Sequence, residues 1–209
     1  MKSVLLVLGI LVIIAFVVLA GGCSSYNHLN TLKQQTDKTW ADVQNVYQRR
    51  ADLIPNLVKT VEGAANFEKS TLTEVAQARQ QVTKIQIDPN TAPTDPETLK
   101  QFQRTQDGLS SALSRLLAVS ERYPDLKATA AFRDLQVQLE GTENRIAVER
   151  RNFNDAVVSY NTAVNSMPAR LYAGAFGFQP KPYFAAREGS DVPPTVQFNF
   201  GNATPAPAK

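Results

Sequence analysis

Apolar side chains recur every seventh residue along two long stretches of the chain. The first row begins at Trp40 and continues through Tyr47, Ile54 and Val61, with a companion row three residues further on. A shorter row of the same kind spans residues 99–116. The second long row consists of Phe132, Leu139, Ile146, Phe153, Tyr160 and Met167. This spacing is typical of helices that pack along their length through coiled-coil-like seams, and it predicts an all-α fold.

Prolines divide these patterns into separate helices. The segment DPNTAPTDPE, residues 88–97, carries three prolines and predicts a loop. Tyr123-Pro124 and Met167-Pro168 mark two further ends, because a residue before proline is disfavoured in the helical conformation. The predicted helices therefore cover about residues 27–62, 66–86, 97–122 and 126–166.

Gly63 decides how the first half of the chain is arranged, because the heptad pattern continues through it. A single helix over residues 27–86 would be ~90 Å long, whereas the helix over 97–122 would cover only ~38 Å of it. A break at Gly63–Asn66 gives pieces of matching length. We therefore predict an antiparallel up-and-down four-helix bundle, with the single long helix as the alternative.

The N-terminal segment predicts a membrane tether. Lys2 precedes an apolar run over residues 4–20, and two glycines separate that run from Cys23. A lone cysteine after small residues resembles a bacterial lipoprotein signal, in which residues 1–22 are removed and the cysteine receives lipid. Such signals usually have a large aliphatic residue three positions before the cysteine, which this chain lacks. The alternative is that residues 4–22 remain as a transmembrane helix.

Either tether gives the same domain organisation. Residues 26–185 form the helical body, and a basic residue ahead of the apolar run favours a body facing the periplasm or the exterior. The stretch 169–185 is rich in aromatic residues, glycine and proline, and we expect it to fold onto the bundle as an ordered cap. Residues 186–209 are polar and rich in proline, alanine and asparagine, which predicts a disordered tail.

Composition excludes several classes of function. The formal charge is +3 with acids and bases well mixed, which is not the concentrated basic patch of a nucleic-acid binder. One cysteine and one histidine exclude a disulfide framework and any metal site that needs several such ligands. The sequence has no glycine-rich phosphate loop and no haem-attachment motif. We therefore expect no catalytic residues, no cofactor and no metal.

The segment LEGTENRIAVERRNFN, residues 139–154, combines carboxylates and arginines with spaced apolar residues. This combination of residues is compatible with a catalytic or metal-binding cluster of carboxylates, and equally with a helix whose role is to pack against its neighbours. Arg50 lies on an apolar row of the first helix, so it needs a charged partner if that row is buried. The bundle register places Arg50 near residues 138–143, which predicts a structural pair with Glu140 or Glu143.

Several segments together resemble the LemA family of bacterial envelope proteins. They are Tyr26-Asn27, QRRADLIPNLVKTVEG (48–63), LSSALSRLL (109–117), YPDLKA (123–128), FRDLQVQLEGTENRIAVERRNFNDAV (132–157) and FGF…YF (176–184). The resemblance implies a helical bundle tethered by an N-terminal membrane segment, without an established enzymatic activity. It also implies roles such as membrane-compartment organisation or envelope signalling. It brings no agreed catalytic or ligand site, so no such residue is carried over.

The sequence therefore predicts a membrane-tethered, non-enzymatic scaffold or adaptor of the cell envelope. Its partners would be the membrane, through the N-terminus, and a protein or a second copy of the chain. The rival hypothesis is a ligand sensor or a carboxylate-metal enzyme that uses the region of Arg50, Glu140 and Glu143.

Overall fold

The computed structural model describes the backbone of residues 2–64, 67–85 and 87–185, with side chains throughout except at residues 2–8 and 10–21. In this part of the chain all regular structure is helical and no strand occurs, which confirms the all-α prediction. The predicted disordered tail, residues 186–209, lies outside the described residues.

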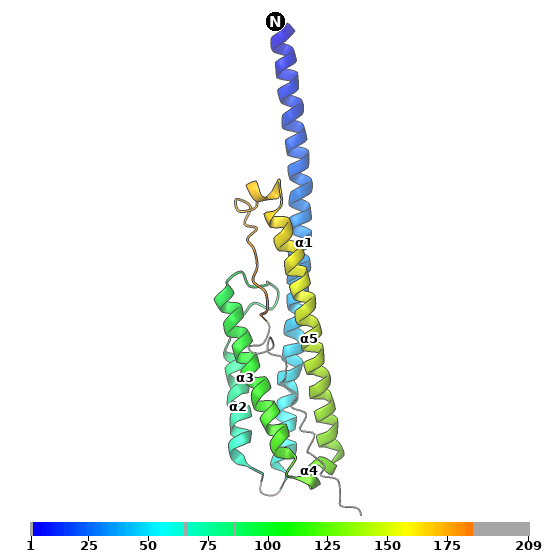
Figure 1. Ribbon diagram of the computed structural model, residues 1–209, viewed down its shortest axis with the longest axis vertical. Helices are drawn as coiled ribbons and strands as arrows, with labels where there is room; N and C mark the ends of the chain where they lie inside the picture. The colour runs from blue at the N-terminus through cyan, green and yellow to red at the C-terminus, as the bar shows by residue number, and fades with distance from the viewer. Residues whose placement is uncertain (1, 65–66, 86, 186–209) are drawn as a thin grey trace, which may run out of the picture.

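The chain forms two pairs of helices that lie side by side (Figure 1). The helices are α1 (Lys2–Glu62), α2 (Lys69–Lys84), α3 (Pro96–Ser120), the short α4 (Pro124–Ala128) and α5 (Ala130–Asn165), followed by the 3-10 turn η1 (Ala169–Leu171). α1 packs mainly against α5, and α2 packs mainly against α3. In Figure 1 the chain descends along α1, rises along α2, descends along α3 and rises again along α5.

Helix boundaries follow local chemistry. α1 ends at Glu62 and α2 begins at Lys69, so the chain reverses beside Gly63. α3 begins where Asp95 accepts hydrogen bonds from the backbone N–H groups of Glu97 and Thr98. This contact satisfies donors that the first turn of a helix leaves unpaired.

Two predicted boundaries were wrong. The first helix was expected to begin near residue 27, but α1 begins at Lys2, so the N-terminal segment and the body share one continuous helix. The predicted helix 126–166 is divided at Thr129, which has an extended backbone with ψ 136°. The hydroxyl of Thr129 accepts a hydrogen bond from the N–H of Phe132 at 3.3 Å, so this residue ends α4 and caps α5.

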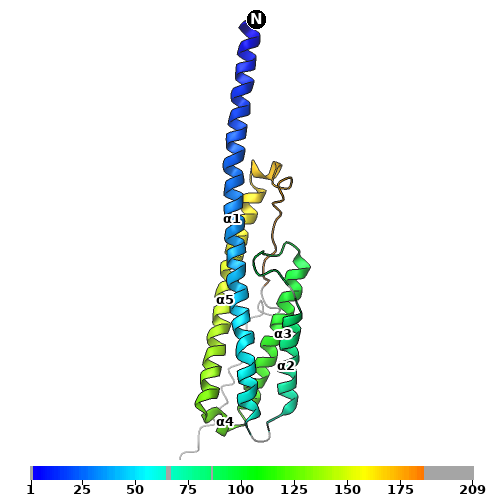
Figure 2. The same cartoon turned by 180° about the vertical axis from the view of Figure 1, so that it is seen from behind.

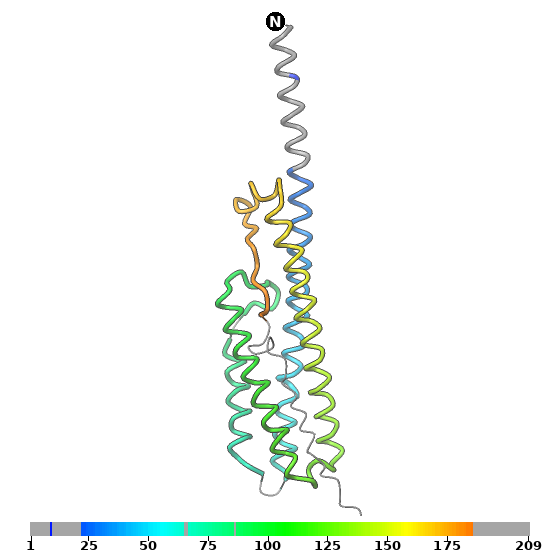
Figure 3. Tube along the Cα trace, in the orientation of Figure 1, coloured from blue at the N-terminus to red at the C-terminus, as the bar shows by residue number. Residues whose placement is uncertain are grey.

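The α2–α3 pair is shorter than the α1–α5 pair and flanks only the part of it that lies away from the N-terminus (Figures 1 and 2). Nearer the N-terminus, the chain after α5 covers the long pair. Residues 166–178, here called the cap turn, fold back beside α1, and residues 179–185, here called the strap, then descend in extended form toward the α2–α3 loop (Figure 3).

The buried core consists of three clusters stacked along the long axis. The cluster farthest from the N-terminus includes Ile54, Leu57, Leu109, Leu116 and Phe132. The middle cluster includes Trp40, Tyr47, Phe102, Phe153 and Phe184. The cluster under the cap turn includes Leu29, Tyr160, Val164, Ala173 and Phe178. The strap thus completes the middle cluster, which the sequence rows of α1 and α5 only half define.

The apolar N-terminal run falls on residues whose side chains are not described. Among the residues that are described, no helix combines the length and the apolar content that crossing a membrane requires.

Candidate functional site

Among the described side chains of α1, Arg50 is the most deeply buried charged one, with an exposed fraction of 2%. Its Nη1 donates to Ser110 Oγ at 2.6 Å and to Glu143 Oε2 at 2.9 Å. Its Nη2 donates to the side-chain oxygen of Gln106 at 2.5 Å and to the Gln106 carbonyl at 3.2 Å. The guanidinium therefore joins α1 to both α3 and α5 through acceptors on all sides of its terminal nitrogens.

The structure distinguishes between the two glutamates that the sequence offered. Glu143 contacts Arg50, and its side chain is 42% exposed. Glu140 lies one turn away and accepts a hydrogen bond from Gln136 on the exposed face of the same helix, at 3.0 Å. The two carboxylates therefore do not converge on Arg50: of the two partners that the sequence left open, Glu143 forms the pair.

Tyr47 lies one turn before Arg50, and the guanidinium carbon sits 5.1 Å from the centre of its ring. Such a contact attracts the cation to the face of the ring. Burial raises the pKa of the Tyr47 hydroxyl, because ionisation would place a second charge in the core. The nearby arginines Arg150 and Arg50 oppose this shift but do not cancel it.

This arrangement suits a structural lock better than a catalytic centre. The terminal nitrogens of Arg50 point at internal acceptors, so they are not offered to a ligand from solvent. Within the described residues, no group of three or more histidine, cysteine, aspartate or glutamate side chains could hold a metal ion. The geometry therefore offers one buried charge that fixes the register of three helices.

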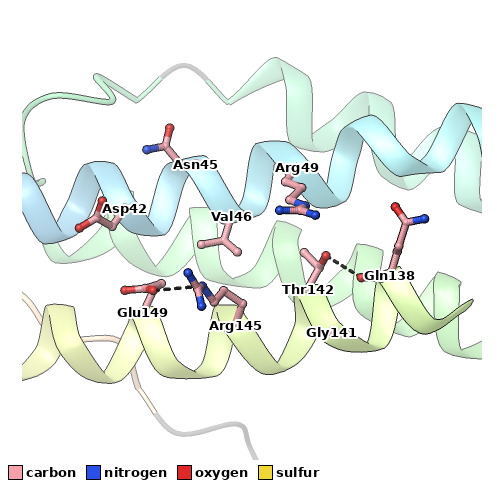
Figure 4. Close-up of a pocket in the computed structure, with 9 residues that line it drawn as sticks. All are labelled: Asp42, Asn45, Val46, Arg49, Gln138, Gly141, Thr142, Arg145 and Glu149. Atoms are coloured by element: carbon pink, nitrogen blue, oxygen red, sulfur yellow. Dashed lines mark hydrogen bonds and ion pairs between the residues drawn. The ribbon is translucent and has the colours of Figure 1, made fainter. Parts of the chain in front are cut away.

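A groove runs along the outer face of the α1–α5 pair (Figure 4). Its lining residues are Asp42, Asn45, Val46, Arg49, Gln138, Gly141, Thr142, Arg145 and Glu149. Arg145 and Glu149 pair along α5 at 3.6 Å, and Glu149 is the less exposed partner. A second hollow continues this groove toward the N-terminus and shares Asp42 and Glu149 with it. The groove presents both signs of charge, which suits a protein surface with polar groups better than a single small anion or cation.

Cys23 is exposed on α1 and forms no disulfide. It lies just before the first residues that contact the cap turn. The Tyr26 ring is 5.5 Å from the Phe176 ring and 5.4 Å from the Phe178 ring. His28 is exposed nearby. The cysteine that the sequence predicts to be lipidated is thus accessible at the end of the body nearest the N-terminus.

Sequence reasoning missed the partners of Arg50 on α3. Gln106 was visible as a polar residue within an otherwise apolar row, and that interruption was the signal that a buried polar contact exists there. Ser110 carried no such signal, because it lies next to the row rather than on it. Arg50 itself was identified because it takes the place of an apolar residue in the companion row of the first helix.

Comparison with known proteins identifies similar sequences. The model of the LemA family matches residues 39–198. Magnetosome protein MamQ 1 of Paramagnetospirillum magneticum is 26% identical over 204 residues, which cover 90% of this chain and 74% of that protein. Magnetosome protein MamQ of Magnetospirillum gryphiswaldense is 24% identical, with 91% of this chain and 75% of that protein covered. Protein LemA of Metamycoplasma hominis is 28% identical over 58% of this chain and 51% of its own length.

Proposed function

The chain belongs to the LemA family, and on that premise we propose that it is a membrane-tethered, non-enzymatic scaffold or adaptor of the bacterial cell envelope. Its body would stand on the membrane as an up-and-down bundle, facing the periplasm or the exterior. The names of its relatives, magnetosome proteins and a LemA protein, designate no reaction. The interior consists mainly of packed apolar rows, and its buried arginine is bonded to internal acceptors, which supports a role in holding other molecules rather than in transforming them.

An exposed apolar patch is the observation that best supports a membrane tether. It lies at the end of the body from which α1 continues toward Lys2. Four exposed apolar side chains of α1 and the cap turn, here together called the cap patch, belong to this end: Tyr26, Met167, Leu171 and Phe176, of which Tyr26 and Phe176 are in contact. The cap turn lies beside α1 at this end (Figure 3). Exposed apolar clusters mark interaction sites, and a tyrosine among them is typical of a water–lipid boundary.

The same patch fits both forms of the tether. If residues 1–22 are removed and Cys23 carries lipid, Tyr26 follows the lipid attachment by about 5 Å along the helix. If residues 4–22 remain, the apolar helix continues directly out of the body through α1. In both cases the cap patch would lie at the lipid surface, and two kinds of membrane contact would hold the body more firmly than one.

Binding to a protein partner is proposed for the outer groove of α1 and α5. Its mixed charges and its continuation along two helices suit a polar protein surface or a second copy of this chain. Photo-crosslinking in the native host tests this directly. A photoreactive residue in place of Asn45 or Gln138, which line the groove, should give a discrete protein adduct. The same residue in place of Thr73, exposed on α2, is the matched control and should give none.

Two experiments distinguish the scaffold proposal from the rival hypothesis of a carboxylate-metal enzyme. Adducts that form at both groove positions and not at the control support the scaffold, whereas their absence at both groove positions contradicts it. The carboxylate-metal rival is tested by elemental analysis of the purified full chain. Stoichiometric iron, manganese or zinc that is lost in Glu143→Gln would refute the non-enzymatic proposal.

A further inference from the structure

The strap is held to α5 by asparagine side chains that pair with both polar groups of a strap residue. Asn161 accepts the N–H of Lys181 at 2.8 Å and donates to the carbonyl of the same residue at 2.8 Å. Asn154 does the same for Phe184, at 2.9 Å and 3.1 Å. The two asparagines are seven residues apart on the helix, about 10 Å, and an extended chain covers that distance in three residues.

A third amide repeats this contact from the other side. Gln103 on α3 accepts the N–H of Ala185 at 3.2 Å and donates to its carbonyl at 3.0 Å. Arg150 adds a second donor to that carbonyl at 2.9 Å. Among the described residues, the strap makes no hydrogen bond to the backbone of a helix or a strand beside it. Side-chain amides therefore supply the hydrogen bonds that a neighbouring β-strand would supply in a sheet. Because they bind only backbone groups, these contacts do not depend on the sequence of the strap.

Lys181 supplies the first sequence-dependent contact. Its ammonium group is buried, and it donates to the carbonyl of Ala92 at 2.6 Å and to Asp37 Oδ1 at 3.2 Å. Asp37 also accepts the N–H of Ala92 at 3.0 Å, so α1 and the α2–α3 loop form this pocket together. A buried ammonium requires such partners. The pocket is therefore specific for a cation with a long side chain.

Phe184 supplies the second contact, three residues later. Its ring stacks on Trp40 with centroids 6.1 Å apart and meets the edge of Phe153 at 5.5 Å. Phe102 closes the box at 6.5 Å, and the guanidinium of Arg150 covers the ring at 4.8 Å. These contacts have the geometry that aromatic pairs and cation–π contacts favour.

The residues between the two anchors contribute less. Pro182 is partly exposed, and the side chain of Tyr183 is exposed although its hydroxyl accepts a hydrogen bond from Asn161 at 3.0 Å. A chain bound by its backbone, with two buried side chains and open positions between them, has the form of a recognised peptide. We propose that the groove between α1, α3 and α5 is a peptide-binding site that the strap occupies in cis, and that its ligands are extended segments with a lysine followed three residues later by an aromatic residue.

This inference deepens the proposed scaffold function by naming the chemical class of a partner segment. A partner would displace the strap, which is joined to the described body only through the cap turn. A tethered strap competes at an effective concentration on the order of millimolar, so an untethered peptide should bind the wild-type chain weakly. Substitutions that weaken the two anchor residues of the strap, and leave the groove between α1, α3 and α5 unchanged, should make the peptide-binding site accessible.

The test uses the full chain in mild detergent and a fluorescent peptide with the strap sequence QPKPYFA. The Lys181→Ala/Phe184→Ala chain should bind this peptide at least about tenfold more tightly than the wild-type chain, because its own strap competes less. A control peptide, QPAPYAA, should bind at least about tenfold more weakly than QPKPYFA, since it lacks both anchors. Adding Asn154→Ala to the variant should also weaken binding, because the backbone of the peptide loses the two hydrogen bonds that Asn154 makes to the strap.

Equal binding of the two peptides, or no gain over the wild-type chain, would overturn the proposal. A second measurement on the wild-type chain covers the case in which the variant does not fold. The N–H groups of Lys181 and Phe184 should exchange with solvent faster than those of Phe153 and Val157 in α5, because the strap opens while the bundle stays folded. Exchange of both sets at one common rate would make the strap a permanent part of the fold. Neither result depends on the membrane tether, so failure here leaves the proposed function to its own test.

Discussion

Replacing Arg50 with alanine tests the lock between the helices. The substitution removes both donors from Gln106 and one from each of Ser110 and Glu143. Gln106 is buried, so its side-chain oxygen would lose its partner without gaining full access to water. The face of Tyr47 would also lose the cation that covers it.

The expected loss of folding free energy is about 3 kcal/mol. An unsatisfied buried acceptor costs about 1–3 kcal/mol, and the cavity left by a long buried side chain adds to that cost. Glu143 contributes a smaller part, because its side chain is 42% exposed and water can replace the arginine. Glu143→Ala leaves the buried guanidinium without its anionic partner while Ser110 and Gln106 still accept from it, so we expect a cost of about 2 kcal/mol and a coupling to Arg50 of about 1–2 kcal/mol.

The assay is denaturant unfolding of the full chain in mild detergent, followed by helical circular dichroism and by the fluorescence of Trp40. A double-mutant cycle with Glu143→Ala gives the coupling, and Glu140→Ala serves as the matched control on the same helix. The control should change stability by less than about 0.5 kcal/mol and show no coupling. A loss below about 1 kcal/mol for Arg50→Ala, or equal coupling to both glutamates, would show that Arg50 does not hold the helices together through these buried contacts.

Two further predictions concern the tether and the ionisation of the core. We expect intact mass to show loss of residues 1–22 and addition of lipid at Cys23, and Cys23→Ser to abolish both; a wild-type chain of full mass without lipid would instead indicate that residues 4–22 are retained. Because burial raises the pKa of Tyr47, the unfolded chain releases this proton first above about pH 10, so stability should fall as pH rises from there. Tyr47→Phe should lose less stability than the wild-type chain between about pH 10 and 11, and identical slopes would contradict the pKa argument.

The heptad rows carried most of what the sequence could predict. They marked Trp40, Ile54, Phe132 and Phe153 as buried, and these residues do lie in the core. The rows also marked Arg50 as a buried charge, because a polar residue on an apolar row has to find a partner. Periodicity works here because each long helix buries one continuous stripe against its neighbour.

Finer features depend on contacts that periodicity does not encode. The seam sets the register of α1 and α5 to about one helical turn, and within that tolerance Glu140 and Glu143 are both possible partners of Arg50. The break at Thr129 depends on a hydroxyl cap rather than on glycine or proline.

The strap was predicted only as part of an ordered cap, for a related reason. It is an extended segment whose backbone pairs with side chains of two distant helices, α3 and α5. Asn154, Asn161 and Gln103 would each pass for a solvated polar residue in a helix when the sequence is read alone. Their contacts with Lys181, Phe184 and Ala185 become visible only when the chain is folded.

Fluorescence quenching by lipids can measure whether the cap patch lies at the lipid surface. Leu171→Trp and Val137→Trp replace side chains of similar exposure, 75% and 67%, at opposite ends of the body. Val137 lies about 42 Å from the end of α5 that carries the cap turn. The two full-length variants, reconstituted into vesicles, share the fluorescence of buried Trp40 as a common background.

Lipids brominated near the headgroup then report contact with the membrane. We expect these lipids to quench the added fluorescence of Leu171→Trp and to leave that of Val137→Trp unchanged. Equal quenching of the two variants, or no quenching at Leu171→Trp, would contradict a body that stands on the membrane with its cap patch in the lipid surface.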